Sequence, residues 1–126
     1  MIFYFPGMAV GMILLQTAIV APGLFRTLEI EDFGRSIRNL WPKFFISLAM
    51  VGFLGTMMLY LDGDTTAHRY VITGLTFFLS SICYLIIPAT NKATDEGNHR
   101  RFDTLHRLSV SFTLLILIAN IAYYFL

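Results

Sequence analysis

The stretch Tyr70–Asn91, with the sequence YVITGLTFFLSSICYLIIPATN, contains no Asp, Glu, Lys, Arg or His. An uncharged apolar run of this length can cross a bilayer core of about 30 Å as an α-helix. Three further uncharged stretches occur in the chain, namely Met1–Phe25, Phe44–Leu61 and Leu108–Leu126. The sequence therefore predicts an all-α integral membrane protein in which four helices form one bundle.

The composition agrees with this prediction, because 56% of the 126 residues are hydrophobic and only 13% are charged. We expect a single domain over residues 1–126, with helices at about 3–28, 42–61, 69–90 and 99–126. The first stretch has no basic segment before it and no small-x-small cleavage site, so we interpret it as a retained helix. The net charge of +1 argues against a nucleic-acid partner, which would require a basic face.

The positive charges indicate how the chain faces the membrane. Residues 26–43 and 92–107 together hold eight of the nine Lys and Arg residues, and the interval between the second and third stretches holds only Arg69. Cytoplasmic loops carry an excess of Lys and Arg, so these two loops are predicted to be cytoplasmic and both termini to lie outside. The compact loops and the small size favour a bacterial inner membrane, in which the termini would be periplasmic.

The first basic loop has the pattern of a short amphipathic helix rather than of a flexible connection. Its apolar residues recur at roughly helical spacing, at Leu28, Ile30, Phe33, Ile37 and Leu40. We expect this segment to continue the first helix in part and to lie at the cytoplasmic interface, between the first and second helices. Trp41-Pro42 then opens the second helix.

Proline and glycine residues predict where the helices bend, end and pack. Pro22 is expected to kink or end the first helix, and the third helix is expected to end near Pro88. Small residues allow close helix contact within membranes. The pair Gly52 and Gly55 therefore predicts a packing seam on the second helix, and Gly7-x-x-x-Gly11 predicts a weaker one on the first.

Few polar side chains fall at membrane depth. Gln16 and Asn120 are the strongest of them, and we expect Gln16 to form a hydrogen bond between helices, because unpaired polar groups are costly in lipid. No Asp, Glu, Lys, Arg or His lies within any of the four stretches. Ion pathways and proton relays normally require such residues, so a pump or a proton-coupled transporter is disfavoured.

One constellation near the start of the fourth helix has the spacing of a ligand site. His99, Asp103 and His106 are related by i, i+4 and i+7 and would share one helix face, which suits a Zn or Cu ion, and either histidine would suit a haem. The neighbouring Arg100, Arg101 and Arg107 repel a cation and favour an ordinary solvated helix start. A second acidic group, Asp62, Asp64 and His68, could also gather a cation on the outer face, although Asp-Gly-Asp is more typical of a turn.

Three motifs resemble the transmembrane protein 205-like domain family, a four-helix membrane domain without a settled activity. They are VAPGLFRTL at 20–28, LWPKFF at 40–45 and FDTLHRLS at 102–109, and they occur in the family's order and spacing. The family-like positions are Pro22, Phe25, Arg26, Pro42, Phe102, His106 and Ser109. One departure is Phe112, where the family often has Asn.

The resemblance implies a distant kinship with the copper-resistance protein D superfamily, which includes small haem-associated membrane proteins. It also suggests a structural role for the matching residues. We expect His106 and Ser109 to hydrogen-bond the helix ends near Pro22 and Pro42, and Arg26 to pair with Asp103.

The sequence favours a non-catalytic protein, an accessory or stabilising subunit of a larger membrane complex, whose partners are membrane lipids and other membrane subunits. A haem- or copper-associated protein that uses His106 with His99 is one alternative. A small oligomeric exporter or permeability factor, with a polar path through Gln16 and Asn120, is the other.

Overall fold

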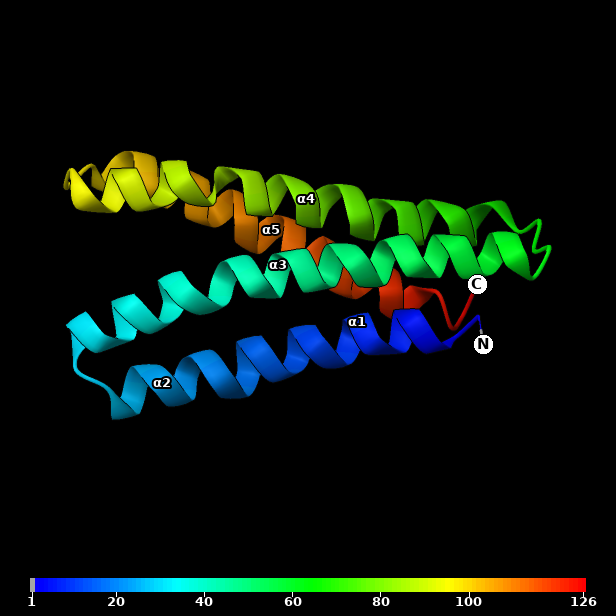
Figure 1. Cartoon of the computed structure of the whole chain (residues 1–126), viewed down its shortest axis with the longest axis horizontal. Helices are drawn as coiled ribbons and strands as arrows, with labels where there is room; N and C mark the ends of the chain where they lie inside the picture. Colours follow the sequence, from blue (N-terminus) through cyan, green and yellow to red (C-terminus); the bar gives the residue numbers. More distant parts are fainter. Residues whose placement is uncertain (1) are drawn as a thin grey trace.

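The computed structural model describes residues 2–126, so Met1, where the first predicted stretch begins, lies outside the described residues. The first span consists of α1 (Tyr4–Leu14), a π-helical segment η1 (Leu15–Val20) and α2 (Ala21–Thr27). It is followed by three long helices, α3 (Ile30–Leu61), α4 (Ala67–Asp95) and α5 (His99–Ala122). All four spans are long and apolar enough to cross a membrane (Figure 1). The prediction of an all-α membrane bundle is therefore confirmed.

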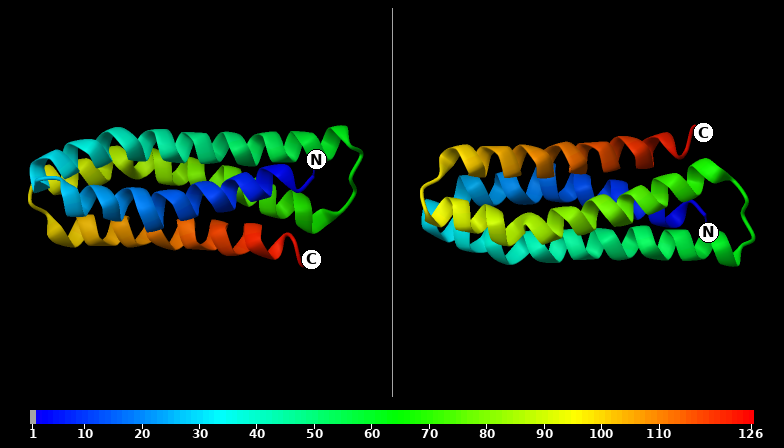
Figure 2. Two further views of the ribbon diagram at one scale, coloured as in Figure 1. Left: turned by 90° about the horizontal axis from the view of Figure 1, so that it is seen from below. Right: turned by 90° about the horizontal axis from the view of Figure 1, so that it is seen from above.

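The spans run alternately up and down the bundle, so its two ends differ in chemistry. Both termini and the α3–α4 turn lie at one end, which we call the termini end (Figures 1 and 2). The α2–α3 and α4–α5 turns lie at the other, which we call the basic end because eight of the nine Lys and Arg residues flank these turns.

The centre of the bundle is filled by apolar side chains from several helices. Ala9, Ile13, Leu48, Cys83 and Ile116 are each no more than 1% exposed and belong to one cluster. Dense packing of this kind fixes the relative positions of the helices.

Glycine allows α3 to approach α4 closely, as the small-residue seam predicts. A Cβ atom on Gly52 would lie 2.6 Å from the backbone nitrogen of Phe77. In the weaker pair, Gly7 and Gly11, Gly7 alone lies at a close contact. A Cβ on Gly7 would meet the Tyr124 hydroxyl at 2.7 Å, whereas Gly11 has nothing within 4 Å.

Most polar groups at membrane depth are paired inside the bundle. The Asn120 side-chain nitrogen donates to the Thr76 hydroxyl and to the Ile116 carbonyl, both at 2.8 Å. The prediction for Gln16 is wrong. Its side chain is buried, but its Nε2 has no hydrogen-bond partner within residues 2–126.

The amphipathic segment belongs to the second span rather than to the first. The backbone is extended at Leu28, with φ −107° and ψ 150°, and α3 then runs without a break from Ile30 through Pro42. Glu31 and Asp32 lie in its first turn, where negative charge is favourable near the helix N-terminus. The segment is helical, as predicted, but it does not continue the first helix.

Two other helix ends also differ from the prediction. α4 continues past Pro88 to Asp95, and beyond the proline the Thr90 hydroxyl donates to the Ile86 carbonyl at 3.0 Å. Proline is tolerated inside membrane helices, and this helix passes through it without ending. α5 ends at Ala122 rather than at residue 126, and Tyr123 and Tyr124 form a turn that contacts the N-terminal residues.

In the first span the distortion precedes the proline. Ala21 N–H donates to the Gln16 carbonyl, five residues earlier, and the wider π turn extends over Leu15–Val20. Pro22 then lies in the first turn of α2, where its missing N–H costs little. Pro22 therefore distorts the helix, as expected, without ending it.

Candidate functional site

The basic half of the bundle contains a cavity of about 530 Å³. Near the termini end α1 packs against both α3 and α5, whereas α2 packs closely against α3 alone. The side chains that line this cavity, which we call the basic-end groove, come from all four spans and include Ile13, Phe33, Trp41, His106, Val110 and Leu117. A cavity of this size is in the range of sites for small molecules.

The deep wall of the groove is effectively apolar, although it contains three threonines. Each threonine hydroxyl donates to a carbonyl of its own helix: Thr17 to Ile13 at 2.6 Å, Thr90 to Ile86 at 3.0 Å and Thr113 to Ser109 at 2.8 Å. These hydroxyls are therefore occupied, and apart from Ser109 the remaining deep wall consists of aliphatic and aromatic groups.

The mouth of the groove, at the basic end, is polar. Arg38 lines it and donates to Asp95 on α4 through two nitrogens, at 2.5 and 3.3 Å. Asn91 and His106 also line the groove near this end. A guanidinium has five N–H donors, so the contact with Asp95 leaves others free.

The predicted pair of Arg26 with Asp103 is not among the ion pairs of residues 2–126, so this prediction is wrong. At the basic end α2 stands away from α5. There Arg38 joins α3 to α4 through its ion pair with Asp95. Sequence reasoning missed the Arg38–Asp95 pair, because the two residues lie 57 positions apart and neither belongs to a motif.

The third sequence motif lies on the groove. Phe102, His106 and Ser109 share one face of α5 and all line the cavity, and the His106 ring stacks on Phe102 with centroids 5.4 Å apart. Within the described chain neither the His106 ring nor the Ser109 hydroxyl bonds a helix end near Pro22 or Pro42. The expected hydrogen bonds are therefore absent, because the groove separates these groups.

The remaining family-like positions surround the same region. Phe25 packs edge-on against Phe33, which lines the groove, with ring centroids 5.3 Å apart. Pro22 follows Ala21 and Pro42 follows Trp41, and both preceding residues line the groove. Arg26 is exposed and does not line it.

The candidate ligand residues are not gathered into a metal centre. Over residues 2–126 no group of three or more His, Cys, Asp or Glu side chains is placed to hold an ion. His99 and Asp103 are exposed on α5 and lie outside the groove lining. His106 is thus the one member of the predicted set that reaches the cavity, and binding of haem or metal stays a prediction.

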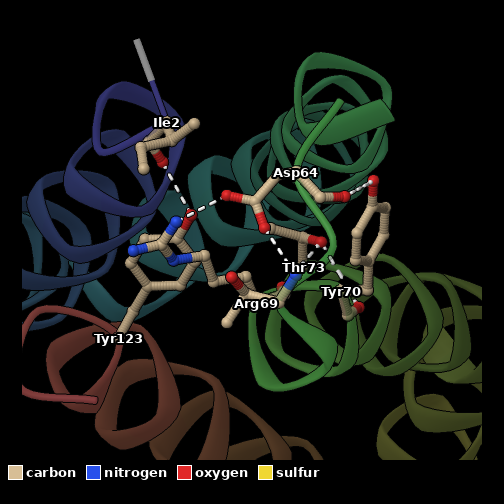
Figure 3. A network of polar contacts seen from close by, with 7 residues as sticks. Ile2, Asp64, Arg69, Tyr70, Thr73 and Tyr123 are labelled. Atoms are coloured by element: carbon tan, nitrogen blue, oxygen red, sulfur yellow. Dashed lines mark hydrogen bonds and ion pairs between the residues drawn. The ribbon is translucent and has the colours of Figure 1, made fainter. Parts of the chain in front are cut away.

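The second acidic group is part of a different structure at the termini end. Asp64 accepts from the Thr66 backbone N–H at 2.7 Å and pairs with Arg69 at 2.5 Å (Figure 3). The Tyr70 hydroxyl donates to the Asp64 carbonyl at 2.8 Å. The Thr66 N–H and the Arg69 guanidinium, against some loss of hydration, hold the pKa of Asp64 below its ordinary value.

The same arginine reaches both chain termini. Its guanidinium lies 5.8 Å from the Phe3 ring centroid and 5.9 Å from that of Tyr123. The Tyr123 hydroxyl donates to the Ile2 carbonyl at 2.9 Å (Figure 3), and Tyr124 donates to Phe3 at 2.8 Å. We call this arrangement the termini clasp. It joins the α3–α4 turn to both ends of the chain.

A shallow hollow of about 460 Å³ lies on the outer face of α3 and α4. Ala49 and Ser81 are small, and Met50, Phe53 and Leu85 around them are at least half exposed. The Ser81 hydroxyl donates to the Phe77 carbonyl at 2.7 Å, so the hollow presents an apolar surface. We call it the outer hollow.

Comparison with known proteins gives a family. A family model described as a domain of unknown function (DUF4149) matches residues 5–99, which covers the first three spans and stops at the start of α5. No curated protein matches the chain, and no solved structure matches it. The chain therefore belongs to the family described as a domain of unknown function (DUF4149).

Proposed function

We propose that the protein is a non-catalytic accessory subunit that stabilises a larger membrane protein complex. The polar groups at membrane depth support this, because Asn120 and the Thr56–Thr73 pair hydrogen-bond within the bundle. These groups hold the helices together and leave the outer surface of the spans apolar. Such a protein acts through the shape of its surface.

The outer hollow is the observation that carries the proposal. Small residues bordered by large ones form a hole into which one side chain of a neighbouring helix can insert. Small residues are also enriched where membrane helices associate. Ala49 and Ser81 supply the small positions, and Met50, Phe53 and Leu85 form the border.

A site-specific crosslinking experiment tests this contact. A photo-crosslinking amino acid replaces Met50 at the border of the outer hollow or, as a control, Ile118 on α5, which is similarly exposed and lines neither cavity. We expect illumination of native membranes to give one discrete protein adduct from the Met50 position and none from Ile118. Mass spectrometry after gentle solubilisation identifies the adduct. Lipid adducts alone at both positions would refute the accessory role.

We also propose that the protein resides in a bacterial inner membrane with its termini in the periplasm. The support is the concentration of Lys and Arg at the basic end. In a Cys83→Ser background, Thr65→Cys and Arg100→Cys place a thiol at exposed positions on opposite ends. A membrane-impermeant maleimide should label intact cells at position 65 and, only after permeabilisation, at position 100. The reverse pattern would invert the topology.

Association with haem or copper is the second candidate, and the position of His106 on the basic-end groove favours it. We propose that the chain is similar to the transmembrane protein 205-like family, whose third motif contains His106, and that the distant kinship with the copper-resistance protein D superfamily is one of fold. The fit is partial, because His106 is the sole groove-lining residue with a side chain able to ligate iron or copper. A second ligand would have to come from a partner subunit. A Soret band or bound copper that is lost in His106→Ala tests the idea.

The exporter hypothesis receives less support. Neither Gln16 nor Asn120 lines the basic-end groove, and the Asn120 amide nitrogen is already bonded to Thr76 and Ile116. A polar path through this chain would therefore require an oligomer.

A further inference from the structure

We propose that the basic-end groove holds one acyl chain of an anionic phospholipid, with the lipid phosphate at Arg38. The proposal concerns a different surface from the outer hollow and does not depend on the accessory role. It rests on the size of the groove, on the distribution of its polar groups and on the charge of the end at which it opens.

The size of the groove excludes a whole transmembrane helix as its occupant. A helix of 20 residues is about 30 Å long and about 10 Å in diameter, so it fills on the order of 2,000 Å³. The groove has about 530 Å³ and an open side where α2 stands away from α5. A flexible chain of methylene groups fits such a space, and its burial is favourable along its whole length.

The polar groups of the groove match the two parts of a phospholipid. The deep section, toward Ile13 and Leu117, is apolar, and its threonine hydroxyls are bonded to their own helices. Arg38, Asn91 and His106 line the groove at the basic end, where the headgroup layer lies if the four spans cross the bilayer, and the Ser109 hydroxyl lies between the two sections. A lipid placed in this direction has its chain and its headgroup in matching surroundings.

Charge selects the headgroup. The two loops at the basic end contain eight cationic and six anionic residues. Arg38 is the cation that lines the groove, and its side chain remains 40% exposed although it is paired with Asp95. Arginine forms charge-assisted hydrogen bonds to phosphate through two nitrogens at once. Arg38 therefore attracts an anionic headgroup more strongly than a zwitterionic one, because the positive group of a zwitterionic headgroup partly cancels the attraction.

Asp95 and the phosphate compete for the same guanidinium. Asp95 accepts from two of the Arg38 nitrogens, at 2.5 and 3.3 Å. Removing the carboxylate should free these donors and strengthen lipid binding, whereas removing the guanidinium should weaken it. A purely structural role of the ion pair would instead make both changes equivalent.

Native mass spectrometry of the delipidated full chain provides the test. Phosphatidylglycerol or phosphatidylcholine with identical acyl chains is titrated onto the protein, and the affinity of the first bound lipid is compared. We expect phosphatidylglycerol to bind preferentially to the unaltered chain. Arg38→Gln should reduce that affinity about tenfold, the scale of one charge-assisted hydrogen bond. Asp95→Asn should preserve or raise it.

Two further variants separate the groove from its surroundings. Arg35→Gln is the matched control, since Arg35 lies one turn away on α3, is 78% exposed and does not line the groove. It should leave the affinity within about twofold, an effect expected of a remote surface charge. Val110→Trp fills the groove and should reduce binding of both lipids. Circular dichroism of every variant confirms that the helices are intact.

Each result decides the proposal. Equal losses in Arg38→Gln and Arg35→Gln would show general attraction to the basic end and would overturn the site. Equal losses in Arg38→Gln and Asp95→Asn would show that the ion pair acts through structure alone. Undiminished binding in Val110→Trp would place the lipid elsewhere.

Discussion

At Gly52 the backbones of α3 and α4 come so close that no side chain fits between them. A Cβ atom there would lie 2.6 Å from the Phe77 nitrogen and 2.9 Å from the Thr73 carbonyl oxygen. Both atoms belong to the backbone of a helix and cannot move aside as a flexible side chain can. A single methyl group would therefore displace one helix relative to the other.

We expect Gly52→Ala to lower the free energy of unfolding by about 1–3 kcal/mol, the usual cost of overpacking a tight core. Gly74→Ala is the matched control, because Gly74 also lies in a membrane helix and a Cβ atom on it would meet nothing within 4 Å. Reversible unfolding in detergent measures both variants. Equal stability of the two variants would contradict the close approach.

At the scale of the helices, hydrophobic runs predicted the number of spans and their order, but not where the helices end. Where a helix ends depends on which groups satisfy the N–H and C=O groups that have no partner within the helix. Pro88 has the signature of a helix end, yet α4 passes through it to Asp95. Glu31 and Asp32 lie in the first turn of α3, and acidic residues are typical of a helix N-terminus. The sequence prediction instead followed the apolar spacing around them and joined this segment to the first helix.

The candidate site was predictable in part for a related reason. Phe102, His106 and Ser109 could be placed on one face of a helix from their spacing, and that face does line the groove. The groove itself depends on the separation of α2 from α5, which no local pattern encodes. Likewise, the pairing of Arg38 with Asp95 joins two helices through residues without a common motif.

The beginning of α5 was predicted at about residue 99, where the structure places it, and the structure gives the physical reason. The Asn98 side chain accepts from the Arg101 backbone N–H at 3.2 Å and so caps the helix. We expect Asn98→Ala to cost about 1 kcal/mol of stability and Asn98→Asp, which keeps an acceptor, to cost much less. Denaturant titration of the detergent-solubilised protein compares them. Indistinguishable alanine and aspartate variants would argue against the cap.

At the scale of the whole molecule, the termini clasp replaces a covalent connection between the ends of the chain. Arg69 contacts aromatic rings near both termini, and two tyrosine hydroxyls bond N-terminal carbonyls from the opposite end of the sequence. The termini end is closed by these contacts, whereas the basic end is open along the α2–α5 seam.

The clasp makes stability depend on pH. Because the pKa of Asp64 is lower in the folded protein than in the unfolded chain, its contribution is complete above the unfolded value, about 3.9, and is lost as the pH falls through the folded value. Asp64→Asn should lower the melting temperature at neutral pH and remove this part of the acid dependence. Thermal melts from neutral to acid pH measure the effect. A difference in melting temperature between the two proteins that stays the same at every pH in that range would show that Asp64 does not contribute to the acid dependence.

The π turn at Leu15–Val20 has a consequence for the phase of the first span. It inserts additional rotation between α1 and α2, and each residue of a helix corresponds to about 100°. The face that α1 turns toward the centre of the bundle nevertheless continues through the π turn, because Ile13, Thr17 and Ala21 all line the basic-end groove. A chain one residue shorter in this stretch would rotate α2 by about 100° about its axis and would turn Ala21 away from the groove.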